Sequence, residues 1–257
     1  MRKMFVVAVL VLLFTGIMFG SLLDDIRKRG VLRVGQDSGY MPLYGTDMEG
    51  NRIGLEVEIL QRMADILGVR LEFVIVNWDG IIPALMTDKF DIIWSGMTIT
   101  PERALRVNFS HAYLTVGQVM VYNTRNFEEL PSYEELRTRD LTIAVQLGTT
   151  GDEAARRMFE NAEILTFDSM DEAAFQVASN RADILVVDSL YARYVAKKYE
   201  VLDVSDEFLT EEDLGVAVRK GDLETLWWIN TFIDWLDTSG IIDELEHEWF
   251  VEYEPQM

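Results

Sequence analysis

The chain has 257 residues, enough for one large domain or two small ones, each able to bury a core. It contains no cysteine, which excludes thiolate nucleophiles, iron–sulfur clusters, Cys-ligated zinc and disulfides. The 44 acidic residues against 23 basic ones give a net charge of −21, which repels phosphate backbones, so nucleic-acid binding is not expected. The only histidines, His111 and His247, lie far apart in the sequence, and we expect no metal site and no cofactor.

The first twenty residues have the pattern of an export signal. Arg2 and Lys3 precede an apolar run that extends to Gly20 and is followed by Ser21. A positive start followed by an apolar stretch is typical of a signal peptide, and a run of this length also suits an uncleaved membrane anchor. Both readings of residues 1–20 predict an extracytoplasmic, periplasmic location.

Short β-rich runs then alternate with helical patterns. The first set consists of a strand at 31–34, a helix at 55–67, a strand at 71–76, a helix at 80–87 and a strand at 91–93. A second set begins after Asn123, with strands at 141–145, 164–167 and 184–187 and helices at 152–159 and 170–179. A strand at 214–219 and helices at 223–236 and 241–250 follow. The alternation predicts two α/β units, each with a mostly parallel sheet.

Two short motifs resemble those of enzymes or nucleotide-binding proteins, but each lacks a residue that the corresponding function requires. Asp37-Ser38-Gly39 occurs around some protease serines, but no histidine stands in a supporting pattern, so we expect a turn after the first strand and no catalytic residue. Gly148-Thr149-Thr150-Gly151 lacks the lysine of a phosphate-binding loop. It fits either an anion site at a helix start or a plain turn with Thr150 as the N-cap.

Polar residues follow the strands, at the sheet edge where open α/β sheets bind ligands. Thr98 and Arg103 come after the strand that ends at 93, and an arginine there can hold a carboxylate with two hydrogen bonds or form a surface ion pair. Asp188 follows an apolar strand and fits either an ammonium partner or a helix N-cap. An acid with three aromatics, a set suited to a cationic side chain, stands at two further connections: Asp37, Tyr40, Tyr44 and Trp78.

In this order, the segments resemble the periplasmic polar amino-acid-binding proteins of ABC importers, the group with arginine-, lysine/arginine/ornithine- and glutamine-binding members. The resemblance runs from about Leu22 to Phe250. It is carried by the stretches 30–35 (GVLRVG), 54–58 (GLEVE), 78–85 (WDGIIPAL), 96–103 (GMTITPER), 108–110 (NFS), 144–151 (AVQLGTTG), 182–188 (ADILVVD) and 248–250 (EWF).

The resemblance implies the two-lobed binding-protein fold (type II), with one lobe at 22–115 and 214–257, the other at 119–210, and hinge crossings near 115–118 and 211–214. It implies an α-carboxylate held by Arg103, Thr98 and the backbone around Gly96 and Thr150, and an α-ammonium held by Asp188. Contacts to the ligand side chain would come from Asp37, Tyr40, Trp78 and Gln146, with Tyr44 and Met97 as further candidates.

The implied function is that of a monomeric receptor, not an enzyme, which captures a polar, basic L-amino acid by lobe closure and delivers it to a membrane permease. Glutamine is the alternative ligand, because an aspartate at position 37 also serves an amide. A dehydratase-like enzyme on the same scaffold is a further alternative, which would need an acid–base group in the cleft. Gly96 stands where several members carry a serine, and 41–44 (MPLY) replaces the commoner PPFE. The second departure weakens the case for arginine in particular.

Overall fold

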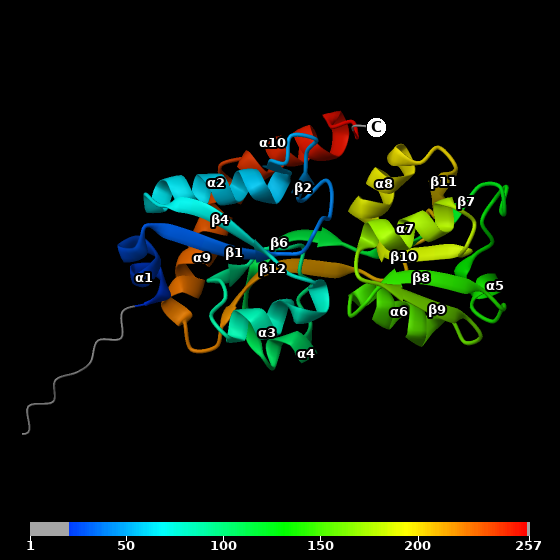
Figure 1. The fold of residues 1–257 in the computed structure, drawn as a ribbon, viewed down its shortest axis with the longest axis horizontal. Helices are drawn as coiled ribbons and strands as arrows, with labels where there is room; N and C mark the ends of the chain where they lie inside the picture. Colours follow the sequence, from blue (N-terminus) through cyan, green and yellow to red (C-terminus); the bar gives the residue numbers. More distant parts are fainter. Residues whose placement is uncertain (1–20, 256–257) are drawn as a thin grey trace, which may run out of the picture.

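A computed structural model describes residues 21–255. The signal peptide or anchor expected at residues 1–20 lies outside the described residues. The chain forms two α/β lobes that lie end to end along the long axis of the molecule, each built around a five-stranded sheet (Figure 1). Within 21–255, no helix combines the length and the apolar character needed to cross a bilayer.

The first lobe contains the sheet β4-β1-β5-β12-β6. Its elements from the N-terminal part of the chain are α1 (Leu22–Arg29), β1 (Val31–Gln36), β2 (Gly45–Thr46), β3 (Arg52–Ile53), α2 (Leu55–Leu67), β4 (Arg70–Ile75), the 3₁₀ turn η1 (Trp78–Gly80), α3 (Ile81–Met86), β5 (Ile92–Ile93), α4 (Pro101–Ala104) and β6 (Val107–Val116). The C-terminal part adds β12 (Glu212–Arg219), α9 (Leu223–Thr238), α10 (Ile241–Glu246) and the π-helical turn η2 (His247–Glu252).

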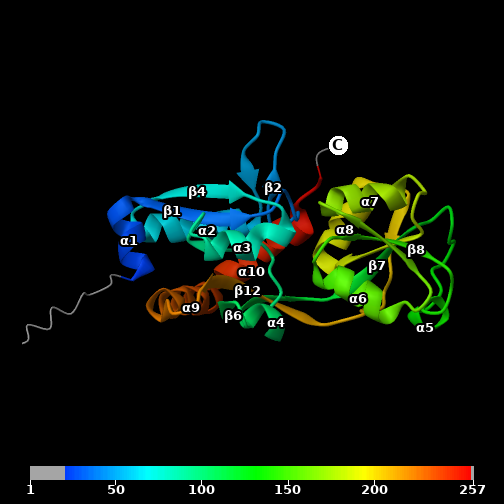
Figure 2. The same cartoon turned by 60° about the horizontal axis from the view of Figure 1, so that its bottom comes forward.

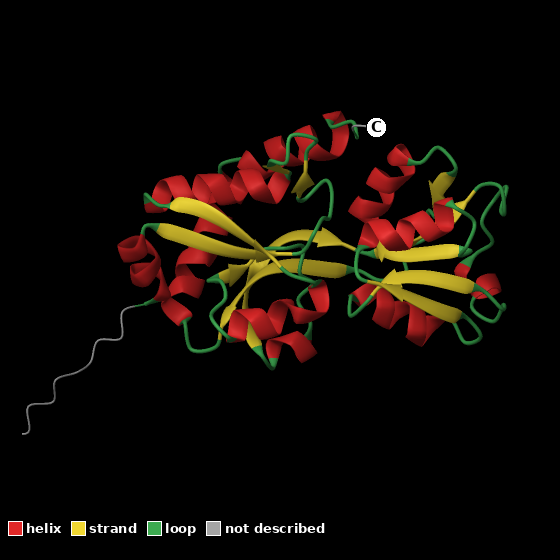
Figure 3. Ribbon diagram, viewed as in Figure 1, coloured by secondary structure: helices red, strands yellow, loops and turns green. Residues whose placement is uncertain are grey.

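The second lobe is formed by the continuous middle of the chain around the sheet β11-β7-β10-β8-β9. Its elements are β7 (Gln118–Asn123), α5 (Tyr133–Leu136), β8 (Thr142–Gln146), α6 (Thr150–Met158), β9 (Glu163–Phe167), α7 (Met170–Ala178), β10 (Ile184–Asp188), α8 (Ser189–Lys198) and β11 (Leu202–Val204). Helices cover both faces of each sheet (Figure 3). The central strands β7 and β10 are buried throughout, as strands covered on both sides must be.

Each sheet combines parallel and antiparallel pairing in equal measure, which refines the expectation of mostly parallel sheets. Strands β1, β4 and β5 pair in parallel, whereas β12 is antiparallel to both β5 and β6. In the second lobe, β8 is parallel to β9 and β10, and β7 is antiparallel to β10 and β11. The antiparallel pairs arise because β6 leaves the first lobe in the direction opposite to that in which β12 returns to it.

The two lobes are joined by two strand connections that run side by side (Figure 2). Strand β6 of the first sheet passes into β7 of the second sheet through the single residue Gly117. The chain returns from β11 to β12, and Glu212 at the start of β12 pairs with Val116 at the end of β6. The link between the lobes is therefore an antiparallel pair of strands.

Helix α2 illustrates how the local sequence builds a lobe. Leu55, Ile59, Leu60 and Met63 recur at helical spacing and are all buried against the sheet. Each such side chain contributes about 1.5–3 kcal/mol of burial free energy. The helix ends at Gly68, which has φ of 69°, a left-handed conformation that glycine adopts without strain. Its buried face fixes one side of the sheet whose strand ends carry the site described next.

Candidate functional site

The residues expected to bind a ligand lie at the carboxyl ends of strands, on the sides of the two lobes that face each other. Asp37, Tyr40 and Tyr44 follow β1, Trp78 follows β4, and Gly96, Met97, Thr98 and Arg103 follow β5; Gln146 ends β8, Thr150 begins α6, and Asp188 ends β10. Direct contacts between the lobes join several of them. We call this set of residues the interlobe site.

Arg103 and Trp78 reach across to the second lobe. The Arg103 guanidinium donates to the carbonyl oxygen of Thr98 at 2.9 Å and lies 3.4 Å from the carbonyl oxygen of Gly148. It also lies 5.3 Å from the centre of the Trp78 ring, whose Nε1 donates to Gly148 at 3.0 Å. Burial lowers the pKa of Arg103, opposed by the charges of Glu153, Glu212 and Asp188. Within residues 21–255 no carboxylate lies within 4.0 Å of this guanidinium, so Arg103 does not form the alternative surface ion pair.

The start of α6 separates the roles of two neighbouring threonines. Thr149, not Thr150, is the N-cap, because its hydroxyl accepts from the backbone N–H of Asp152. The Thr150 hydroxyl lies 3.4 Å from the Thr98 hydroxyl of the first lobe. Both hydroxyls donate to Oε2 of Glu212, at 2.7 Å from Thr150 and 3.0 Å from Thr98. The alternative in which Thr150 is the N-cap is thus wrong, and the Thr150 side chain lies at the interlobe site.

Asp188 lies at the N-terminus of α8, but its side chain makes no capping hydrogen bond. Instead, its Oδ1 accepts from the side-chain amide of Gln118 at 2.7 Å. The residue is 6% exposed, and burial raises the pKa of its carboxyl to about 7, with a further contribution from the negative charge of Glu212. The neighbouring Tyr40 hydroxyl and the positive charge of Arg103 act in the opposite direction.

Asp37 lies at the other end of the site and joins both lobes. Its carboxylate accepts from the Tyr44 hydroxyl at 2.7 Å, from the Gly39 N–H at 3.2 Å and, across the lobes, from the Gln146 amide at 2.8 Å. Burial raises the pKa of Asp37, and these hydrogen bonds oppose the shift. Tyr40 packs edge-on against Tyr44, at 6.1 Å between ring centres, so the tyrosine that bonds this carboxylate is itself packed against a second aromatic ring.

Two of the expected contacts are not available in the predicted form. The Gly96 N–H donates to Glu56 Oε1 at 2.9 Å, so it is engaged within the first lobe. Gly96 itself has φ of 56°, and a Cβ there would lie 2.7 Å from the Tyr40 ring, so this position favours glycine. Met97 is 1% exposed and packs in an apolar cluster with Trp78 and Ile81. Its side chain belongs to the core of the first lobe.

Three polar residues of this region were missed from the sequence. Gln118 and Glu212 lie on the strands that join the lobes, and Glu56 lies in the first turn of α2. Glu56 is fully buried and accepts from Gly96 and from the Tyr113 hydroxyl, and burial raises its pKa to about 7. A sequence signal did exist for Gln118 and Glu212, because both fall inside or beside the expected hinge crossings.

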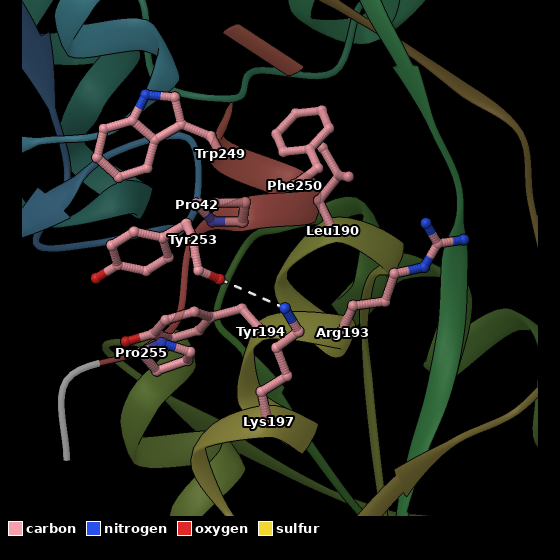
Figure 4. Close-up of a pocket in the computed structure, with 9 residues that line it drawn as sticks. All are labelled: Pro42, Leu190, Arg193, Tyr194, Lys197, Trp249, Phe250, Tyr253 and Pro255. Carbon is pink, nitrogen blue, oxygen red and sulfur yellow. Dashed lines mark hydrogen bonds between the residues drawn. The ribbon is translucent and has the colours of Figure 1, made fainter. Parts of the chain in front are cut away.

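A second region of contact lies between α8 and the C-terminal segment (Figure 4). A pocket there is lined by Pro42, Leu190, Arg193, Tyr194, Lys197, Trp249, Phe250, Tyr253 and Pro255. Trp249 is held to the first lobe by a hydrogen bond from its Nε1 to Glu58 at 2.9 Å. Lys197 of the second lobe donates to the Tyr253 carbonyl oxygen and pairs with Glu254, both at 3.4 Å. The C-terminal segment therefore also bridges the lobes.

The chain belongs to the bacterial extracellular solute-binding proteins, family 3, whose model matches residues 32–252. This match covers both lobes and every residue of the interlobe site. The structural neighbours are type II periplasmic binding proteins, so the two-lobed fold expected from the sequence is confirmed.

Among solved structures, the ancestral amino-acid-binding protein AncCDT-1, described as a precursor of cyclohexadienyl dehydratase, is 45% identical with a TM-score of 0.83, over 90% of this chain and 100% of that one. A mutant of ArgBP from T. maritima is 38% identical with a TM-score of 0.84, over 89% of this chain and 99% of that one. Among curated relatives, the L-cystine-binding protein TcyJ of Escherichia coli (strain K12) is 29% identical over 90% of this chain and 86% of its own length. Cyclohexadienyl dehydratase of Pseudomonas aeruginosa is 30% identical over 71% and 68%.

Proposed function

We propose that this protein is an extracytoplasmic receptor that binds a polar, basic L-amino acid between its lobes and delivers it to an ABC permease. The observation that carries the proposal is that the interlobe site contains an arginine from one lobe and a buried aspartate from the other, close enough for the arginine charge to affect the pKa of the aspartate. Arg103 offers a cation for an α-carboxylate, and Asp188 offers an anion for an α-ammonium. A zwitterion is the ligand that matches both charges.

The acidic end of the site supports a basic side chain. Asp37 is 2% exposed and accepts a hydrogen bond from Tyr44, whose ring packs against that of Tyr40. A cation placed there would gain both the carboxylate and the aromatic faces. The relatives named for arginine and for amino acids in general are consistent with this class of ligand. Glutamine stays the alternative, because its amide could donate to Asp37 and accept from Gln146.

Movement of the lobes is part of the proposal. We take 22–115 with 214–257 and 119–210 as the moving bodies, with hinges near 115–118 and 211–214. Hydrogen bonds of Gln146 and Trp78 across the lobes provide contacts that a closing movement would make and an opening movement would break. Small-angle scattering should show a smaller radius of gyration at saturating ligand, and an unchanged profile would contradict closure.

The decisive experiment is calorimetry of the protein, stripped of ligand by unfolding and refolding, against the twenty amino acids with ornithine and citrulline. We expect binding of arginine, lysine or ornithine. If glutamine is the only amino acid that binds, the assignment of a basic ligand is overturned. If no amino acid of the panel binds, the receptor function is overturned.

An enzymatic role has one specific observation in its favour, the dehydratase among the relatives. The interlobe site also contains an acid, Asp188, whose pKa of about 7 would suit proton transfer. Turnover of a cyclohexadienyl substrate by the wild type, lost in Asp188→Asn, would favour the enzyme. Amino-acid binding without turnover would favour the receptor.

A further inference from the structure

Glu212 is a carboxylate that contacts both lobes from the strand that joins them. It is the first residue of β12, half-buried, and pairs with Val116 at the crossing. One of its oxygens accepts from Thr98 of the first lobe and from Thr150 of the second. The other oxygen accepts from the Thr210 hydroxyl at 2.7 Å, which fixes the side chain against its own connection.

The side-chain amide of Gln118 links Glu212 to Asp188. Gln118 Nε2 lies 2.7 Å from Asp188 Oδ1 and 3.3 Å from Glu212 Oε2. Because both distances start at the same nitrogen, the two carboxylate oxygens are at most about 6 Å apart, within the range at which charges interact strongly. Gln118 is 1% exposed, so this pair of acids lies in a region with little water to screen it.

Two carboxylates so placed repel each other, and a cation between them relieves the repulsion. Besides Glu212, the charged and titratable groups that act on Asp188 are Tyr40, from the loop after β1, and Arg103, from α4. Gln118 of β7 contributes a neutral amide. A primary ammonium brings one positive charge and three N–H donors, enough to bond both acids at once.

We propose that Glu212 is a second acidic residue of the ammonium subsite and that, with Asp188, it makes the site specific for ligands with a primary α-ammonium group. The inference rests on the proposed function and adds to it a specificity-determining residue. Because Glu212 lies on the connection between the lobes, it also places the recognition of the ammonium group at the hinge. An α-hydroxy or α-keto acid would leave the two carboxylates without a cation.

The test compares Glu212→Gln with Glu200→Gln. Glutamine at 212 keeps an oxygen that can accept from the threonines but removes the charge. Glu200 is exposed and lies outside the interlobe site and the hinges, so its variant changes the net charge by the same amount elsewhere. By calorimetry we expect L-arginine to bind at least about tenfold more weakly to Glu212→Gln, and within about twofold of wild type to Glu200→Gln.

A second readout separates an electrostatic role from a structural one. The wild type should release protons on binding at pH 7, measured by calorimetry in buffers of different ionisation enthalpy, because the ligand ammonium favours ionised Asp188. Release should fall in Glu212→Gln, where the repulsion is gone, and persist in Glu212→Asp and Glu200→Gln. Glu212→Asp also serves as the charged variant if Glu212→Gln does not fold.

The outcomes distinguish the two proposals. A wild type that binds no amino acid of the panel would overturn the receptor function itself. If the wild type binds L-arginine and Glu212→Gln binds it equally tightly or more tightly, only the role of Glu212 is overturned. Weaker binding with unchanged proton release, or loss of proton release in Glu212→Asp as well, would make Glu212 a structural residue and would also overturn the inference.

Discussion

The side-chain amide of Gln146, at the end of β8, donates a 2.8 Å hydrogen bond to Asp37, which follows β1 in the other lobe. This contact joins two residues 109 positions apart and closes the site at the end where a ligand side chain would lie. Asp37 is the anionic member of the pair, and Gln146 orients its carboxylate without neutralising it.

Asp37 should determine the preference for a basic side chain. Asp37→Asn removes the charge while keeping the shape, so affinity for arginine, lysine and ornithine should fall by orders of magnitude and affinity for glutamine much less. The aromatic rings would retain only about 0.5–2 kcal/mol of attraction for the cation. Calorimetry measures each ligand, with Asp25→Asn in exposed α1 as the control. Equal losses for arginine and glutamine would show that Asp37 supports only the loop.

Arg103 should be required by every α-amino acid. Arg103→Ala removes the cation opposite the ligand carboxylate, and loss of one partner of such a buried pair costs about 2–5 kcal/mol. That is roughly 30-fold to a few thousand-fold in affinity. Arg106→Ala is the matched control, because Arg106 is exposed and lies only three positions away. Binding by Arg103→Ala within about threefold of wild type would move the carboxylate subsite elsewhere.

Glu56 should make the stability of the ligand-free protein depend on pH. Burial raises the pKa of its carboxyl in the folded state from 4.5 to about 7, so the folded state binds more protons than the unfolded chain between these values. Stability should therefore rise as the pH falls from about 7.5 to 5. Thermal unfolding measured across this pH range should show a smaller rise in stability for Glu56→Gln than for the exposed control Glu49→Gln. Identical slopes in the two variants would contradict the shifted pKa.

A side chain at position 117, where the chain crosses between the lobes, should lower the stability of the folded protein. A Cβ there would lie 2.2 Å from the Thr210 carbonyl oxygen and 2.6 Å from the Phe208 ring, so the two connections would have to separate. We expect Gly117→Ala to destabilise the protein by about 1–3 kcal/mol, measured by denaturant unfolding. Gly80→Ala is the control, since a Cβ there meets nothing within 4 Å. If Gly117→Ala is as stable as the wild type, the two connections can separate enough to accommodate a Cβ, which would contradict this prediction.

The sequence predicted the fold more completely than the site. Helix 55–67 was predicted to the residue, since its apolar spacing and Gly68 are local signals. The location of the candidate residues at strand ends was predicted because open α/β sheets bind ligands at that edge, and their role in binding stays a prediction. Glu212 and Gln118 fall within the expected hinge crossings, but their side-chain contacts were missed because no local pattern encodes hydrogen bonds between the lobes. The same reason explains Thr150, whose hydroxyl turns toward Glu212 while its neighbour Thr149 caps the helix.

The bridge formed by the C-terminal segment bears on the lobe movement that we propose. Its ion pair, Lys197 with Glu254, is solvent-exposed at side-chain exposures of 40% and 76%. An exposed pair of this kind is worth about 0–1 kcal/mol, comparable with thermal energy, and salt weakens it further. The ion pair alone therefore does little to hold the C-terminal segment against the second lobe. In the proposed closure, we expect the inner hydrogen bonds, from Gln146 to Asp37 and from Trp78 to Gly148, to contribute more to the closed shape than this pair does.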